Sequence, residues 1–202
     1  MKKFFLGLFV VLLSVPPLQV AQAKVEVGQP APNFQGTDSQ GNTINLSDYK
    51  GKIVVLEWSN HECPYVVKHY SGGNMQSLQK ETTDQGIVWL TIVSSAKGKQ
   101  GHTTAQEANS VMKAQGAHST ARILDPSGTI GNLYAARTTP HMFVVDTQGI
   151  IAYAGAIDSN SSIKSSTIAG ATNYVREAVN SLVAGKPVEV ASTKPYGCSV
   201  KY

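Results

Sequence analysis

The chain has 202 residues, of which 42% are hydrophobic and 15% charged, with a formal net charge of +4 and only two cysteines, Cys63 and Cys198. This size and cysteine count exclude a small domain held together by disulfides. Lysine and arginine form no runs, so the sequence gives no reason to expect nucleic acid or an anionic membrane surface as a partner.

The first 23 residues have the three-part layout of a secretory signal peptide. Two lysines near the start precede an apolar run over residues 4–13 and a small-residue ending, Ala21-Gln22-Ala23. A serine and two prolines follow the run, which is shorter than the roughly 20 residues of a membrane-spanning helix. We therefore expect cleavage before Lys24, export to the periplasm or beyond the cell, and no stable membrane insertion of the remaining chain.

Residues 24–187 are predicted to form one domain that begins with a polar hairpin. Runs of β-branched and apolar residues predict buried strands, and proline at a first helical position predicts a helix start. In chain order we expect a hairpin turn at 38–41, a short segment at 46–49 and a strand at 53–58. A helix from Pro64 follows, which is interrupted at 71–73 and resumes over 75–83. The next strand is expected at 87–94.

The second half of this domain is predicted to continue the alternation of helices and strands. Capping-box spacing from Thr104 to Glu107 predicts a helix over 105–114. After it we expect strands at 121–124, 142–146 and 150–156, a short helix at 128–135, a last helix over 168–184, and a tail at 188–202. This order predicts an α/β fold with a central mixed sheet and helices on both faces.

Motifs spread over residues 26–202 resemble those of the thioredoxin superfamily. They are Gly28-x-x-Ala31-Pro32-x-Phe34, Asn60-x-x-Cys63-Pro64-Tyr65-Val66, Thr139-Pro140 and the ending Gly197-Cys198-Ser199-Val200-Lys201-Tyr202. The chain most resembles the alkyl hydroperoxide reductase and thiol-specific antioxidant (redoxin) branch, and its ending is similar to that of a peroxiredoxin-like group. The resemblance implies a thioredoxin fold with an N-terminal hairpin extension and a C-terminal tail, and a thiol-based oxidoreductase.

Cys63 is the predicted nucleophile. It follows a predicted strand and precedes Pro64, which suits the first position of a helix. A thiol at a helix N-terminus is close to unpaired N–H groups and a partial positive charge, which favour the thiolate. The alternative is an inert buried cysteine, which is common for this residue type.

Thr139-Pro140 precedes a predicted strand, at the place where redoxins carry a cis-proline loop opposite the nucleophile. A cis bond has a low energetic cost before proline, and it would turn the Thr139 backbone toward a bound substrate. We therefore expect these two residues, with Asn60 and Pro64 beside the cysteine, to form the substrate-binding surface.

The peroxide-activating residues of peroxiredoxins are incomplete in this chain. The proline seven residues and the threonine or serine three residues before the nucleophile are replaced by Leu56 and Asn60, and Pro140 aligns with the catalytic arginine. Arg137 is near enough in sequence to stabilise the thiolate, although it is equally well explained as a solvated loop arginine. We therefore expect peroxide turnover to be weak.

Cys198 is the predicted resolving cysteine. Thioredoxins use a C-x-x-C motif, but here Val66 occupies the second position, so Cys198 is the only internal thiol that can resolve an oxidised Cys63. The alternatives are a permanent disulfide or a free thiol on the tail. The cycle needs no cofactor, since sulfur carries the electrons. The expected oxidant is a peroxide, an oxidised protein or an oxidised small thiol. The expected electron donor is an external thiol.

Three histidines, His61, His69 and His141, raise a second hypothesis. A thiolate with imidazoles forms a soft copper or zinc site, so the chain is alternatively a non-catalytic thiol- or copper-binding module of the same fold. A second local cysteine is missing, and we assign no metal ligands.

Overall fold

A seven-stranded mixed sheet forms the centre of the protein. The structure, a computed structural model, describes residues 25–202, so the predicted signal peptide and its cleavage site lie outside the described residues. The strand order is β2-β1-β5-β4-β3-β7-β8, and β6 and β9 form a separate two-stranded sheet. The strands are β1 (Gln35–Asp38), β2 (Thr43–Asn45), β3 (Val54–Trp58), β4 (Val88–Val93), β5 (Ala121–Leu124), β6 (Thr138–Thr139), β7 (His141–Val145), β8 (Ile151–Gly155) and β9 (Cys198–Ser199).

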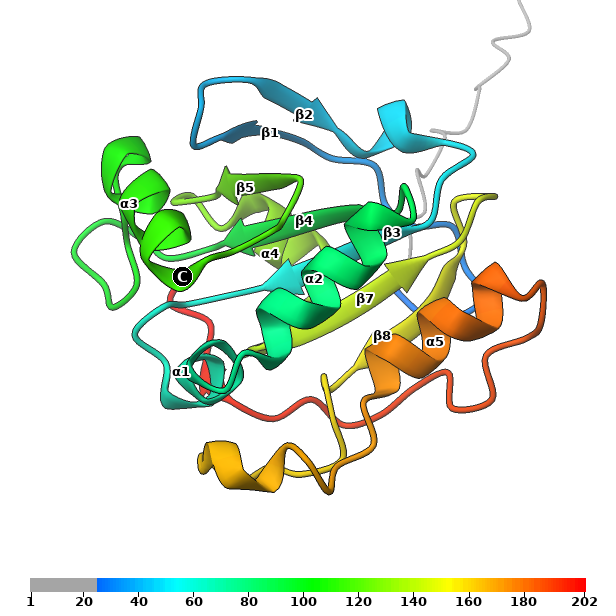
Figure 1. The fold of residues 1–202 in the computed structure, drawn as a ribbon. Coiled ribbons are helices and arrows are strands. Elements are labelled where there is room, and N and C mark those ends of the chain that lie inside the picture. The colour runs from blue at the N-terminus through cyan, green and yellow to red at the C-terminus, as the bar shows by residue number, and fades with distance from the viewer. Residues whose placement is uncertain (1–24) are drawn as a thin grey trace, which may run out of the picture.

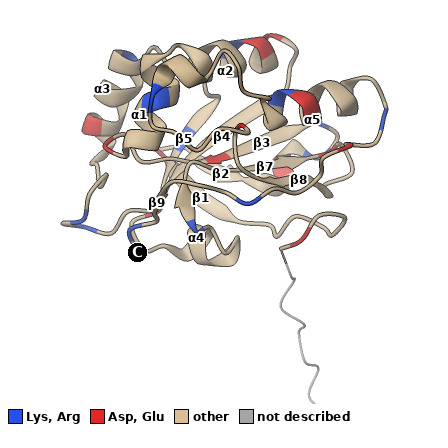
Figure 2. Ribbon diagram, turned by 90° about the horizontal axis from the view of Figure 1, so that it is seen from below, with Lys and Arg blue, Asp and Glu red and all other residues tan. Residues whose placement is uncertain are grey.

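Helices cover both faces of the sheet, as the sequence predicts (Figure 1). Viewed from below, α1, α2 and α5 lie on one side of the sheet and α4 on the other (Figure 2). The helices are α1 (Pro64–Ser71), α2 (Asn74–Asp84), α3 (Ala105–Gln115), α4 (Thr129–Leu133) and α5 (Tyr174–Val183), with 3₁₀ turns η1 (Leu46–Tyr49) and η2 (Ser165–Thr167). Among the described residues, no helix is long and apolar enough to span a bilayer.

The central strand β3 is buried on both faces. It pairs in parallel with β4 and antiparallel with β7. Side chains of a strand alternate between faces, so Leu56 and Trp58 join a core with α4, while Val55 joins a second core under α1, α2 and α5. Burial on both faces explains why the run is apolar except for Glu57, and it gives the residues after Trp58 a rigid base.

The last helix starts later than the sequence predicts. The apolar pattern suggests a start near Ile168, but α5 begins at Tyr174, after an η2 turn and a loop. The Asn173 side chain accepts a hydrogen bond from the Arg176 N–H and caps the helix. Such a cap satisfies one of the free N–H groups of the first turn, which explains why the helix starts there.

The C-terminal tail is part of the fold. After α5 it runs past β8 toward α1 (Figure 1), and it ends at α4, where the Tyr202 ring lies against Gly128 and Gly131. Its residues Cys198–Ser199 form β9, which pairs antiparallel with β6. The sequence predicts the tail but not this strand, because a two-residue strand has no recognisable periodicity.

Candidate active site

Cys63 occupies the position between β3 and α1 that its sequence motif predicts. It is the N-cap residue of α1, with Pro64 in the first turn, and its side chain is 0% exposed. The turn before it is held by Asn60, whose side-chain oxygen accepts from the Glu62 N–H and whose carbonyl accepts from the Cys63 N–H. Asn60 therefore shapes the loop that carries the thiol.

Thr139-Pro140 lies directly against Cys63. The Thr139–Pro140 peptide bond is cis, as predicted. The Cys63 thiol donates a hydrogen bond to the Thr139 carbonyl oxygen over 3.1 Å. The Thr139 hydroxyl is buried and has no oxygen or nitrogen partner, so a thiolate on Cys63 is an available acceptor for it.

Cys198 completes the site from the tail. Strand β9 sets Cys198 opposite Thr139 and Ser199 opposite Thr138. The two sulfur atoms are 2.7 Å apart, and both cysteines are free thiols. Gly197 allows this approach, because its φ is +144° and a Cβ there would overlap the Thr139 carbonyl. The two cysteines of the chain thus meet across 135 positions of sequence.

The tail is anchored next to Cys198 by a buried polar cluster. The Tyr196 hydroxyl donates to Asp158, and its oxygen is 3.2 Å from Nε2 of His69. Asn74 donates to Nδ1 of the same histidine, so Nε2 carries the proton and donates to Tyr196. Lys68 forms an ion pair with Asp158 over 3.3 Å, and both side chains are almost fully buried.

The two thiols have unequal acidity. Burial alone raises the pKa of the Cys63 thiol, but hydrogen bonds from Cys198, the Thr139 side chain and the backbone of Val66 outweigh it, and the net pKa is lowered. Burial, with the hydrogen bond to Cys63 and its charge, raises the pKa of Cys198 to about 11. The first proton to leave therefore comes from Cys63.

Two other predicted site residues, Pro64 and Arg137, are exposed, in contrast to the buried Cys63. Pro64 is exposed at the start of α1. Arg137 is also exposed, and its positive charge contributes to lowering the pKa of His141, which burial lowers to about 4. No interaction in the described part of the chain joins the Arg137 side chain to Cys63, so the structure does not support its predicted role as a thiolate stabiliser.

The histidines form no metal centre with the thiols. His69 belongs to the tail anchor, and Nδ1 of His141 accepts from the Arg137 N–H. Within residues 25–202, no group of three or more His, Cys, Asp or Glu side chains is arranged to hold a metal ion. The copper-binding hypothesis therefore has no cluster of three such ligands among the described residues.

No sequence motif marks the residues that fix the tail. Asp158, Lys68 and Tyr196 lie outside the motifs around Cys63, Thr139 and Cys198. One signal was available: Lys68 lies on the buried face of a predicted amphipathic helix, where a lysine requires a buried acidic partner.

Comparison with known proteins identifies the family. The AhpC/TSA family matches residues 27–154, which is more than half of the chain. The chain belongs to the AhpC/TSA family. It is therefore a member of the redoxin branch of the thioredoxin superfamily, as its motifs suggest.

Relatives with assigned names match only part of this AhpC/TSA chain. Thiol-disulfide oxidoreductases ResA of Bacillus thuringiensis subsp. konkukian and Bacillus cereus are each 35% identical over 78 residues, which cover 33% of this chain and 45% of the relative. The chain thus spans less than half the length of the curated relatives it matches.

Solved structures confirm the thioredoxin fold of the AhpC/TSA chain. A hypothetical protein from Sinorhizobium meliloti 1021 has a TM-score of 0.75 at 21% identity, with 89% of this chain and 96% of that chain covered. The thioredoxin domain of a thiol-disulfide oxidoreductase from Bacteroides vulgatus has a TM-score of 0.50 at 20% identity, with 63% and 86% covered.

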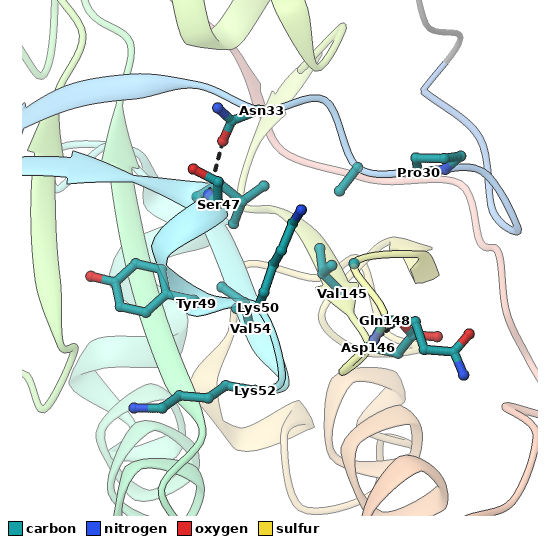
Figure 3. A pocket seen from close by; sticks show the side chains of 13 residues that line it. Pro30, Asn33, Ser47, Tyr49, Lys50, Lys52, Val54, Val145, Asp146 and Gln148 are labelled. Atoms are coloured by element: carbon teal, nitrogen blue, oxygen red, sulfur yellow. Dashed lines mark hydrogen bonds between the residues drawn. The ribbon is translucent and has the colours of Figure 1, made fainter.

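A separate cavity lies at the other end of β3. It has a volume of about 420 Å³ and is lined by Pro30, Tyr49, Val54 and Asp146, among others (Figure 3). Val54 is the first residue of β3 and Cys63 follows its last, so this cavity is not part of the candidate active site.

Proposed function

We propose that this protein is a thiol–disulfide oxidoreductase whose redox couple is Cys63 and Cys198. The observation that carries the proposal is the 2.7 Å separation of the two free thiols. A disulfide bond is about 2.05 Å long, so a small approach of the sulfur atoms is enough to form it. Family membership and the ResA relatives support the same activity.

The couple carries two electrons without a cofactor. In the oxidised protein, Cys63 and Cys198 share a disulfide, and two equivalents of an external thiol reduce it to the dithiol while becoming a disulfide themselves. In the reverse direction, an oxidised protein or small disulfide takes the two electrons. Within the couple, Cys63 is the thiol that ionises first, because its pKa is lowered and that of Cys198 is raised.

Disulfide exchange is favoured over peroxide reduction. Arg137 is exposed and does not interact with Cys63, and Leu56 is a core residue at 0% exposure. Within residues 25–202, Cys63 forms hydrogen bonds with Thr139, Cys198 and the Val66 backbone, and none of these groups carries the positive charge that would activate a peroxide. We propose that the oxidant is a disulfide, that the donor is an external thiol, and that the chain acts after export.

The test is to measure exchange and to map the disulfide. The protein, equilibrated in redox buffers of known potential, should form an intramolecular Cys63–Cys198 bond detectable by mass spectrometry, and should reduce or oxidise a model disulfide substrate catalytically. Cys63→Ser and Cys198→Ser should each abolish turnover, whereas hydrogen peroxide should be reduced slowly. If the bond never forms, or if Cys198→Ser turns over like the parent, the proposed couple is wrong.

A further inference from the structure

The two sulfur atoms differ in their access to solvent. Cys63 is 0% exposed beneath the tail and the Thr139 loop, whereas Cys198 is partly exposed. We infer that external sulfur compounds exchange with the couple at Cys198, and that Cys63 is an inner nucleophile that reacts only with the sulfur of Cys198. This inference rests on the proposed redox couple and reverses the order in which the sequence suggests that the cysteines act.

The tail is held on both sides of Cys198, so it is not a loose tether that uncovers Cys63. Before Cys198, the Tyr196 hydroxyl is bound to Asp158 and His69. After it, the Ala96 N–H donates to the carbonyl of Lys201 over 2.8 Å, and the Tyr202 hydroxyl donates to the Ala136 carbonyl. Displacing the tail would break these contacts together, which favours exchange at the sulfur that already reaches solvent.

The chemistry of leaving groups favours the same order. An external thiolate attacks Cys198 of the Cys63–Cys198 disulfide, forms a mixed disulfide with Cys198, and releases Cys63 as the thiolate. A leaving thiol of lower pKa departs faster, and the hydrogen bonds from the Thr139 side chain and the Val66 backbone stabilise the Cys63 anion also when Cys198 is bonded to another sulfur. A second external thiolate then attacks the external sulfur of the mixed disulfide. This step forms the external disulfide and releases Cys198 as a thiolate, and that thiolate takes up a proton.

A basic residue lies beside the exposed sulfur. The positive charge of Lys201 acts on Cys198 and opposes the rise of its pKa. The Lys201 ammonium also donates to the Ser199 hydroxyl, 3.3 Å away on β9. An incoming thiolate is an anion, so the positive charge of Lys201 attracts it toward Cys198.

The decisive experiment locates the external adduct. The oxidised full-length protein is mixed with excess 2-mercaptoethanol, quenched with acid at short times, and mapped by mass spectrometry. We expect the adduct on Cys198, with Cys63 free, in at least about tenfold excess over the reverse, as expected for one accessible sulfur. An equal or larger amount of adduct on Cys63 overturns the inference while leaving the redox couple intact.

A second measurement uses the single-cysteine variants and does not depend on disulfide formation. An activated aromatic disulfide should label Cys198 in Cys63→Ser faster than it labels Cys63 in Cys198→Ser, despite the lower pKa of Cys63. In denaturant this difference should disappear or reverse, which shows that the fold causes it. Faster labelling of Cys63 in the folded protein contradicts the inference, whether or not the Cys63–Cys198 bond forms.

Discussion

At the scale of single residues, the site depends on how Cys63 is stabilised as a thiolate. A helix N-terminus provides N–H groups, as the sequence indicates. The structure adds two donors from elsewhere in the chain, the Cys198 thiol and the Thr139 side chain. The Thr139 hydroxyl has no other partner, and a buried hydroxyl without a partner carries an energetic cost. Ionisation of Cys63 relieves that cost.

Thr139→Val should therefore raise the pKa of Cys63. The valine keeps the shape of the side chain but removes the hydroxyl, and a hydrogen bond to a charged group contributes about 1.5–3 kcal/mol, or about 1–2 pKa units. The shift is measured by comparing two proteins, Cys198→Ser and the double variant that carries Cys198→Ser and Thr139→Val. In each, the thiolate absorbance of Cys63 is followed against pH. Because the thiolate is lost as pH falls through the pKa, the variant loses it at higher pH.

Thr138→Val is the matched control for this titration. The Thr138 hydroxyl donates to the Pro140 carbonyl and not to Cys63, so its removal should leave the titration of the thiol unchanged. An unchanged titration in Thr139→Val, or an equal shift in both variants, would show that the Thr139 hydroxyl does not stabilise the thiolate.

At the scale of secondary structure, the pairing of β9 with β6 positions Cys198. The strands share only two residue pairs, Thr138 with Ser199 and Thr139 with Cys198. Gly197, with φ +144°, lies against the Thr139 carbonyl, where a larger residue has no room. The backbone of the tail thus comes close to the cis-proline loop only because this position is glycine.

Gly197→Ala should weaken the internal disulfide. Overpacking of this kind costs about 1–3 kcal/mol, which corresponds to about a 5- to 150-fold change in an equilibrium constant. The equilibrium between dithiol and disulfide, measured in glutathione buffers, should shift toward the dithiol by that factor.

Gly170→Ala provides the comparison for this variant. A Cβ at Gly170 meets open space, so its redox equilibrium should match that of the parent. Equal equilibrium constants for all three proteins would mean that the close approach at Gly197 does not position Cys198.

At the scale of the whole molecule, the tail connects the C-terminal end of the chain to the first helix. Its anchor joins Tyr196 to Asp158, which follows β8, and Asp158 pairs with Lys68 of α1. Charges of both signs are spread over the rest of the ribbon (Figure 2). The described domain thus has a buried ion pair at the anchor of the tail that carries Cys198.

Oxidation should stabilise the whole domain. A Cys63–Cys198 bond closes a loop spanning 135 positions, for which the chain-entropy estimate is about 5 kcal/mol before any strain. Guanidinium unfolding of the oxidised and reduced protein should show the difference, and Cys198→Ser should show none between the same two conditions. Equal unfolding midpoints for the two forms of the parent, with the bond verified by mass spectrometry, would contradict this expectation.

The sequence by itself determined the local features of this protein. The buried strand before Cys63, the helix that Pro64 begins, and the capping box at Thr104 and Glu107 all depend on neighbouring residues, and the structure contains each of them. The motif around Cys63 and the Thr139-Pro140 pair also indicated the fold, because a few residue types at fixed spacing suffice to recognise it.

Only the tertiary structure decided how the distant parts meet. The cysteine count made Cys198 the only internal candidate to resolve Cys63, but the β6–β9 pairing brings the sulfur atoms to 2.7 Å. The exposure of Arg137, the late start of α5 and the burial of Cys63 beneath the tail depend on contacts between residues far apart in sequence. Such contacts are set by how the elements pack, and no local pattern of residues encodes them.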